Sequence, residues 1–159
     1  MSTPRLPTLE ECRVMGASCA CSNLRRSARI ITQHYNARFE PSGVNAMQFT
    51  ILGTLHALGG LGLGALAEEV TLDPSTMTRN LAVLEKRGWV QIKPGADRRE
   101  RRAVLTAKGK RSLAKAYPAW LEAQRALSEP FGARRYQALL GSLRELTAPV
   151  RATTRGRDD

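Results

Sequence analysis

The sequence predicts a mainly helical fold that carries one small β-hairpin. Three observations support this prediction. Apolar residues recur at helical spacing in several segments, glycines and prolines separate these segments, and two short β-prone runs flank a Pro-Gly turn. With 159 residues, the chain is long enough for one domain with extensions.

Two helices are expected in the first third of the chain, after a loose arm at residues 1–9. Leu24, Ala28, Ile31 and Tyr35 follow a helical spacing, which predicts a helix that begins near residue 18 or 22 and ends at residue 39. Asn45 can cap a second helix before the segment "GGLGLG" ends it. The expected buried face of this second helix carries Met47, Ile51, Leu52, Leu55 and Leu58.

A short helix over residues 63–70 is followed by the stretch "TLDPSTMTRNLAVLEKRGWV", which predicts a sharply bounded helix. Asp73 is a good N-cap, Pro74 fits the first helical position, and Gly88 is a good stop. The spacing of Met77, Leu81 and Leu84 places them toward the core. The opposite face is small, polar and basic, and carries Ser75, Thr76, Thr78, Arg79, Ala82 and Lys86.

The next stretch, "WVQIKPGADRRERRAVLT", predicts a basic hairpin. "WVQIK" and "RRAVL" are the expected strands, and "PGADRR" is the turn between them. After Thr106 a long helix is expected, which Pro118 should kink or split and Pro130 should end. A last helix has an apolar seam at 3–4 spacing, followed by a polar tail, "RATTRGRDD". The seam carries Tyr136, Leu139, Leu143, Leu146 and Val150.

The charge of the chain favours an anionic partner. The formal net charge is +11, and the window 86–111 has ten Lys and Arg against two acids, a net of eight. Nucleic acid is the first expectation and an anionic membrane surface the second. No segment resembles a transmembrane span or a signal peptide, so a cytoplasmic protein with no membrane partner is expected.

The predicted order of elements is that of a helix-turn-helix followed by a wing. In such a unit the second helix lies in the major groove of double-stranded DNA and presents its N-terminal residues to base edges. Here those residues are Ser75, Thr76, Thr78 and Arg79. Arginine can donate two hydrogen bonds to guanine, and the wing arginines would reach the minor groove or the phosphates.

These segments resemble the MarR family of bacterial transcriptional regulators over residues 24–115. The resemblance rests on "ALAEEVTLDPSTMTRNLAVLEKRGWVQIKPGADRRERRAVLTAKGK", above all on "LEKRGWV" and on "DRRERRAVLTAKG". It implies one chain, 1–159, with a winged helix-turn-helix domain at 45–106 and a helical dimerisation region at 18–44 and 107–150. It also implies a homodimer on a pseudo-palindromic operator, a repressor as the expected mode, and neither enzymatic activity nor a cofactor.

Site residues follow from this resemblance by position. Ser75, Thr76, Thr78 and Arg79 match the recognition helix, and Lys86 lies further along the same face. Asp97 and Arg99 match the wing signature, in which the acid holds the arginines in place. The expected DNA contacts of the wing are Arg98, Arg99 and Arg101, and which of Arg98 and Arg99 enters the groove is left open.

Regulators of this kind are commonly switched by a small molecule or by cysteine oxidation, and both remain open here. A small aromatic or anionic effector would suit a pocket that offers cations and aromatic walls. The candidate residues are Arg26, His34, Tyr35, His56 and Trp120, although Tyr35 and Trp120 also fit ordinary apolar stripes.

The three cysteines, Cys12, Cys19 and Cys21, lie within ten residues of one another. If a helix begins next to Cys19 and Cys21, its dipole together with Arg25 and Arg26 would favour reactive thiolates that sense oxidants or thiophilic metals and metalloids. Their spacing predicts no zinc or iron–sulfur site. The competing interpretation is three small cysteines buried in a dimer interface.

Two further classes of protein are alternatives. A cysteine-dependent enzyme would need Cys19 together with His34 or His56 as the base, and no local motif supports it. A non-specific architectural DNA-binding protein would use the same basic surface, with little dependence on base sequence and a steep dependence on salt.

Overall fold

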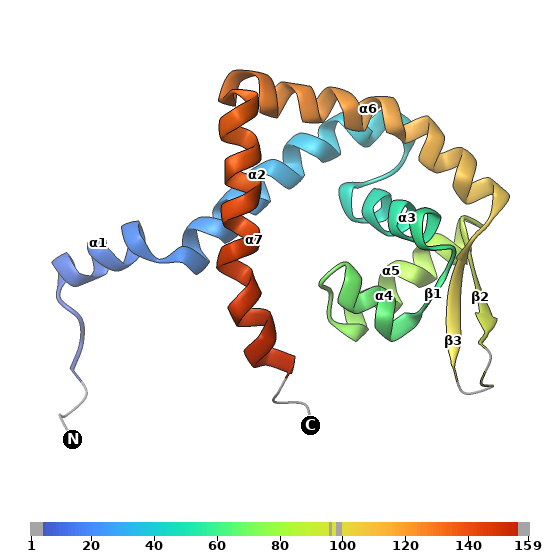
Figure 1. The fold of residues 1–159 in the computed structure, drawn as a ribbon, viewed down its shortest axis with the longest axis horizontal. Helices are drawn as coiled ribbons and strands as arrows, with labels where there is room; N and C mark the ends of the chain where they lie inside the picture. The colour runs from blue at the N-terminus through green and yellow to red at the C-terminus, as the bar shows by residue number, and fades with distance from the viewer. Residues whose placement is uncertain (1–4, 96, 98–99, 156–159) are drawn as a thin grey trace. The chain divides into compact units, whose positions relative to one another are not determined.

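The computed structural model describes the backbone of residues 5–95, 97 and 100–155. The chain forms two compact units, residues 1–117 and residues 118–159. Figure 1 labels the α-helices and the strands. In chain order they are α1 (Leu9–Ser18), α2 (Ala20–Phe39), the 3-10 turn η1 (Glu40–Ser42), α3 (Ala46–Leu58), β1 (Leu61–Gly62), α4 (Leu63–Glu69), α5 (Pro74–Lys86), β2 (Val90–Pro94), β3 (Arg101–Leu105), α6 (Ala107–Phe131) and α7 (Ala133–Arg155).

The core of the first unit is formed by α3, α4, α5 and the sheet. Ile51, Leu52 and Leu55 of α3 are at most 1% exposed and pack in one cluster with Leu66 of α4 and Val90 of β2. The predicted buried face of α3 is therefore confirmed in its middle. It is wrong at Leu58, which is 51% exposed because it lies in the last turn of the helix, next to the left-handed cap at Gly59.

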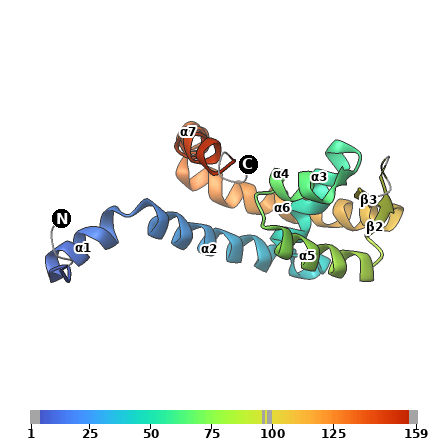
Figure 2. The same ribbon diagram turned by 90° about the horizontal axis from the view of Figure 1, so that it is seen from below.

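The expected hairpin is part of a three-stranded antiparallel sheet with the order β1-β3-β2. The second long strand, β3, has the predicted bounds, whereas β2 begins and ends one residue later than the run "WVQIK". The two strands pair from Val90↔Leu105 to Pro94↔Arg101. The additional strand is β1, which pairs Leu61 with Ala103 and Gly62 with Arg102. The segment "GGLGLG" thus ends α3 and also supplies an edge strand. Figures 1 and 2 show the hairpin and α1 at opposite ends of this unit.

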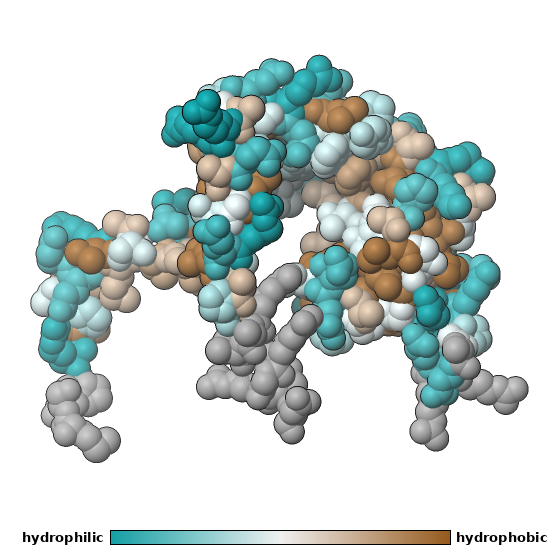
Figure 3. Space-filling view, in the orientation of Figure 1, coloured by the Kyte–Doolittle hydropathy of each residue, from teal (hydrophilic) through white to brown (hydrophobic). Residues whose placement is uncertain are grey.

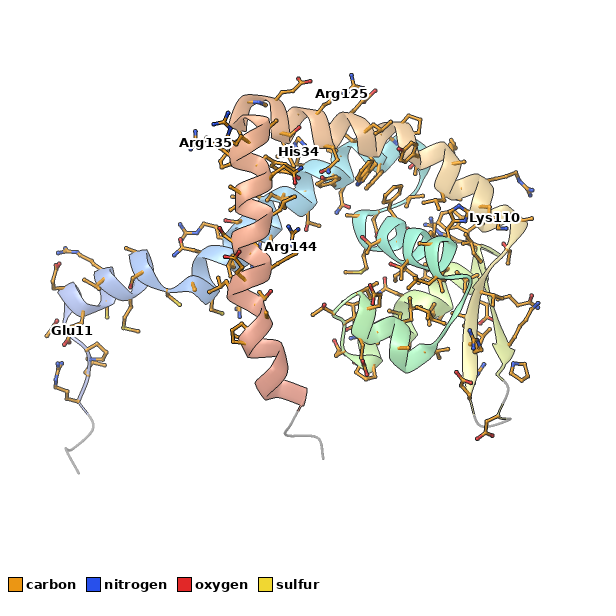
Figure 4. All side chains as sticks on the ribbon, viewed as in Figure 1. Glu11, His34, Lys110, Arg125, Arg135 and Arg144 are labelled. Carbon is orange, nitrogen blue, oxygen red and sulfur yellow. The ribbon has the colours of Figure 1, made fainter. Side chains whose placement is uncertain are left out.

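The N-terminal region contains a helix, α1, where a loose arm and an unstructured approach to α2 are expected from the sequence. A reciprocal capping box holds the start of α1, in which Thr8 accepts from the backbone of Glu11 and Glu11 accepts from the backbone of Thr8. The Glu11 carboxylate, labelled in Figure 4, also pairs with Arg5. The hydrogen bond from Arg5 and the one from the Thr8 backbone lower the pKa of Glu11 to about 2.

The second unit is a helical hairpin. The backbone of α6 remains helical through Pro118 and ends one residue after Pro130. Gly132 adopts a φ of 87°, which allows the chain to turn into α7. The Tyr136 hydroxyl donates to Oε1 of Gln124 across the turn, at 3.2 Å. α7 continues to Arg155, so residues 151–155 extend the helix instead of beginning a polar tail.

Candidate nucleic-acid interface

α5 presents one polar face because its other face is buried. Met77, Leu81 and Leu84 are 1%, 3% and 0% exposed and belong to the core cluster. The helical period therefore directs Ser75 and Arg79 away from the core, and both side chains are exposed. The predicted buried stripe of this helix is confirmed.

The start of α5 is held by Asp73, the N-cap residue. Its carboxylate accepts from the Thr76 backbone at 2.8 Å and from the Ser75 hydroxyl at 2.6 Å. Hydrogen bonds from Ser75 and Thr76 favour the ionised form and hold the pKa of Asp73 well below its usual range. The same bonds fix the orientation of the Ser75 hydroxyl at the exposed end of the helix.

Further along this face, Arg79 and Thr78 also have partners in the free protein. The Arg79 guanidinium donates to Oγ1 of Thr76 at 3.1 Å, and the Thr78 hydroxyl donates to the Pro74 carbonyl at 2.8 Å. These contacts preorganise the polar face, since the two side chains are held along the helix. Lys86 is exposed at the last turn of the same helix.

Several hydrogen bonds join the end of α5 to the hairpin. The Ile92 backbone N–H donates to Oε1 of Glu85 at 3.2 Å, and the Thr106 hydroxyl donates to the Gly88 carbonyl at 2.7 Å. The backbone N–H of Thr106 donates to the Trp89 carbonyl at 3.0 Å. The hairpin is therefore joined to the end of α5 at two places, within β2 and at the residue that follows β3.

The structure explains why the segment "LTAKG" has a glycine, Gly109, at its last position. Thr106 accepts from the Gly109 backbone at 3.0 Å, as an N-cap residue would, at the start of α6. A Cβ atom at position 109 would collide with the Trp89 carbonyl oxygen, so only glycine lets α6 begin this close to the start of β2.

The predicted wing residues are only partly described by the structure. Arg101 is the exposed first residue of β3, and Asp97 is an exposed residue of the turn whose carbonyl accepts from the Glu100 backbone at 2.9 Å. Arg98 and Arg99 lie outside the described residues. The space-filling view shows hydrophilic side chains along the described part of the hairpin (Figure 3).

Of the five candidate effector residues, the structure brings His34 and Tyr35 into contact. Their rings meet edge to face at 5.8 Å on α2, where Arg38 donates to Nδ1 of His34 at 2.9 Å (Figure 4). Arg26 and His56 are exposed on α2 and α3, respectively. Trp120 belongs to the second unit, where it is half-buried on α6.

A groove of about 510 Å³ opens in the first unit, where the end of α2 and the start of α3 meet the end of α5. Arg87 borders it and donates to the Gly43 carbonyl, while its guanidinium lies 4.7 Å from the Trp89 ring centre. None of the five candidate effector residues is among those that line this groove. Its lining residues are Asn36, Ala37, Glu40, Gly43, Val44, Asn45, Gln48 and Arg87.

Cys12, Cys19 and Cys21 are free thiols with exposed side chains. Cys19 lies at the break between α1 and α2 as the N-cap of α2, and Cys21 lies in the first turn of that helix. The Arg25 guanidinium is 3.8 Å from Sγ of Cys21. Within the described parts of the chain, no cluster of three or more His, Cys, Asp or Glu residues could hold a metal ion.

A capped helix followed by a basic hairpin is the architecture of a winged-helix protein, and this chain has that fold. No helix in the described ranges is long and apolar enough to cross a membrane.

Comparison with known proteins identifies the family. The MarR family model matches residues 44–100. The MosR transcriptional regulator of M. tuberculosis, solved in complex with DNA, is 36% identical with a TM-score of 0.70, and the match covers 82% of this chain and 99% of that one. A mutant MarR from E. coli, solved with operator DNA, has a TM-score of 0.76 at 19% identity and covers 84% and 97% of the two chains.

An HTH-type transcriptional regulator of Bacillus subtilis, YwoH, is 34% identical over 83 residues. This match covers 52% of the present chain and 61% of the length of the relative. The chain belongs to the MarR family, whose members are transcriptional regulators and not enzymes.

The Asp73 cap predicts a specific dependence of stability on pH. Because its pKa is lowered by folding from an ordinary 3.8, the unfolded chain takes up the proton first as the pH falls. The contribution of Asp73 is therefore complete above about pH 4 and is lost as the pH falls through the lowered folded value. Asp73→Asn keeps an N-cap acceptor that does not titrate.

Thermal melts between pH 5 and pH 2 test this expectation. The Tm of Asp73→Asn should fall less steeply than that of the wild type, since all other carboxylates are common to both proteins. Parallel curves would show that the Asp73 carboxylate is not held as described.

Proposed function

We propose that this chain is a sequence-specific DNA-binding transcriptional regulator, in the repressor mode, that binds a pseudo-palindromic operator as a homodimer. The observation that carries the proposal is the division of α5 into a buried stripe and an exposed polar face beside a basic hairpin. The DNA complexes of the MosR and MarR structures support it. An architectural DNA-binding protein would have no need for the preorganised polar face.

The proposed contacts divide into two kinds. Ser75, Thr76, Thr78 and Arg79 meet base edges in the major groove, because they occupy the first turns of the recognition helix. Lys86, Arg101, Arg98 and Arg99 supply charge to the backbone or the minor groove, and Asp97 braces the wing. In the protein without DNA, the Arg79 guanidinium donates to the Thr76 hydroxyl, one turn back along the helix.

Selection of bound sequences from a random duplex library tests this proposal. The wild type should enrich one short inverted repeat, and Arg79→Ala should relax the preference at one position by about 1–3 kcal/mol. Arg101→Ala is the matched control, which should weaken binding to all sequences alike and reduce its salt dependence. Recovery of unrelated sequences by the wild type would instead support the architectural alternative.

The dimer proposal rests on apolar side chains that one chain leaves exposed. Leu24 and Ile31 of α2 are 37% and 41% exposed, and Leu139 and Leu146 of α7 are 41% and 52% exposed. These residues lie on two apolar stripes within 18–44 and 107–150, the ranges that the family resemblance assigns to dimerisation; the stripes alone would also suit an intramolecular core. A symmetric dimer would place two recognition helices about 34 Å apart, one turn of DNA.

Replacement of Leu146 by Glu should convert the dimer to a monomer, because it places a charge on the proposed apolar interface. The mass in solution, measured by light scattering, should halve, and operator affinity should fall by at least about tenfold as one half-site is lost. Glu145→Gln, a change at the preceding exposed residue, is the control. A wild type that is monomeric at micromolar concentration would contradict the proposal.

The proposed signal is release of the operator by an oxidant, by a thiophilic metalloid or by a small aromatic or anionic effector. For the thiols, the supporting observation is that all three are exposed and that Arg25 adjoins Cys21. For an effector, it is the contact of His34 with Tyr35 and Arg38; Arg26, His56 and Trp120 remain candidates.

A triple variant, in which Cys12, Cys19 and Cys21 are each replaced by Ser, distinguishes a thiol signal from a small-molecule effector. Peroxide or arsenite should release the wild type from DNA in an electrophoretic shift assay and should leave the variant bound, because serine forms neither disulfides nor metalloid–thiolate bonds. An equal response of both proteins would exclude the thiols. Aromatic acids that release both proteins would point to the effector site.

A further inference from the structure

We propose that Glu100 is a positioning residue of the wing. Its side chain packs against the backbone of Gly95 in the turn and of Gly62 in β1, and these two glycines are called its seat below. The inference rests on the proposed function, because it concerns how the wing is presented to DNA. Glu100 does not contact DNA in this account. It acts through Arg101, the next residue of the chain.

The first half of the seat is at β1. A Cβ atom at Gly62 would lie 2.8 Å from Oε1 of Glu100, which is closer than side-chain atoms pack. The carboxylate therefore lies directly on the backbone of β1, in space that any other residue at position 62 would fill. Figure 1 shows that β1 is the short strand beside β3, and that the hairpin extends beyond it.

The second half of the seat is at the turn. A Cβ atom at Gly95 would lie 2.5 Å from Oε2 of Glu100 and 2.9 Å from its Cβ. The backbone closes the same turn, since Gly95 donates to the Glu100 carbonyl at 2.7 Å and Glu100 donates to the Asp97 carbonyl at 2.9 Å. The main chain of Glu100 thus closes the turn, while its exposed side chain packs against the backbone of both Gly95 and Gly62.

Arg102 makes a second contact with the edge of the sheet formed by β1 and the glycine before it. Its guanidinium donates to the Gly60 carbonyl at 2.9 Å. Glu100 directly precedes β3 and continues its pairing through the hydrogen bond from Gly95. Because successive side chains of a strand alternate between its two faces, Glu100 and Arg102 share one face and Arg101 points to the other. Two attachments to the glycine-rich edge therefore fix the face on which Arg101 is exposed.

Electrostatics alone predicts the opposite effect for Glu100. A carboxylate in a basic hairpin repels phosphates, so its removal should strengthen DNA binding if it has no other role. A positioning role predicts weaker binding when the side chain is removed. The sign of the change therefore distinguishes the two accounts.

Three single variants of the full chain distinguish the effect of the contact between Glu100 and the glycines from the effect of its charge. Glu100→Gln keeps the shape and removes the charge, and Glu100→Ala removes both. Gly62→Ala leaves Glu100 in place but displaces the end of its side chain. This displacement should not unfold the protein, because the atom that must move is the end of a flexible side chain.

A measurement without DNA comes first, and it uses trypsin, which cleaves after the arginines of the wing. Because an acidic residue after arginine itself slows trypsin, variants are compared in pairs that have the same charge at position 100. Glu100→Ala should be cleaved in the wing several times faster than Glu100→Gln, and Gly62→Ala several times faster than the wild type. Melting temperatures should stay within a few degrees, which shows that the change is local. Equal cleavage within each of the two pairs would overturn the proposal.

Binding to the selected operator is then measured by fluorescence anisotropy. Glu100→Ala and Gly62→Ala should each bind about fivefold more weakly, on the order of one lost wing contact. Glu100→Gln should bind as tightly as the wild type or more tightly. In the Glu100→Ala background, Gly62→Ala should have no further effect, because its partner is gone.

The proposal is overturned if Glu100→Ala binds as tightly as the wild type or more tightly, if Glu100→Gln is as weak as Glu100→Ala, or if Gly62→Ala has the same effect in both backgrounds. Failure of the proposed function is a different result. A wild type that selects no DNA sequence would refute that function, while the trypsin measurement would still test the seat.

Discussion

The structure depends on the burial of one stripe of α5. Met77, Leu81 and Leu84 fill the core between α3, α4 and the sheet, and their removal from water is the main favourable term that holds the helix in place. A helix with one stripe buried has a fixed rotation about its own axis. The side chains on the opposite face, Ser75 and Arg79 among them, are therefore exposed as a consequence of packing and not of their own contacts.

Hydrogen bonds at both ends of α5 fix the neighbouring segments relative to this helix. Asp73 fixes the first turn of α5, and Glu85 and Thr106 fix the hairpin to its last turn. The close approach of α6 to the Trp89 carbonyl, which Gly109 permits, places the next helix on the same support. A recognition helix and a wing that are held in one frame can read adjacent grooves of one duplex, and this property connects the fold to the proposed function.

The sequence predicts these features well where the signal is local. The cap at Asp73, the buried stripe of α5 and both strands of the hairpin depend on residues close in the chain, and all are confirmed. β1 escapes prediction because its two residues, Leu61 and Gly62, have no β-prone pattern and become a strand only by pairing with β3, about forty residues away. The contact of Glu100 with Gly62 is not predicted for the same reason.

By contrast, α1 could have been predicted, since Thr8 and Glu11 have the spacing of a capping box.

We propose an arrangement on DNA in which the exposed face of α5 enters the major groove while the hairpin lies on the adjacent minor groove. Dimethyl sulfate protection tests it most directly, because this reagent methylates guanine N7 in the major groove and adenine N3 in the minor groove. We expect two patches of protected guanine N7 about one helical turn apart, each flanked by protected adenine N3. Bound DNA that shows no protection at guanine N7, or uniform protection along its length, would contradict it.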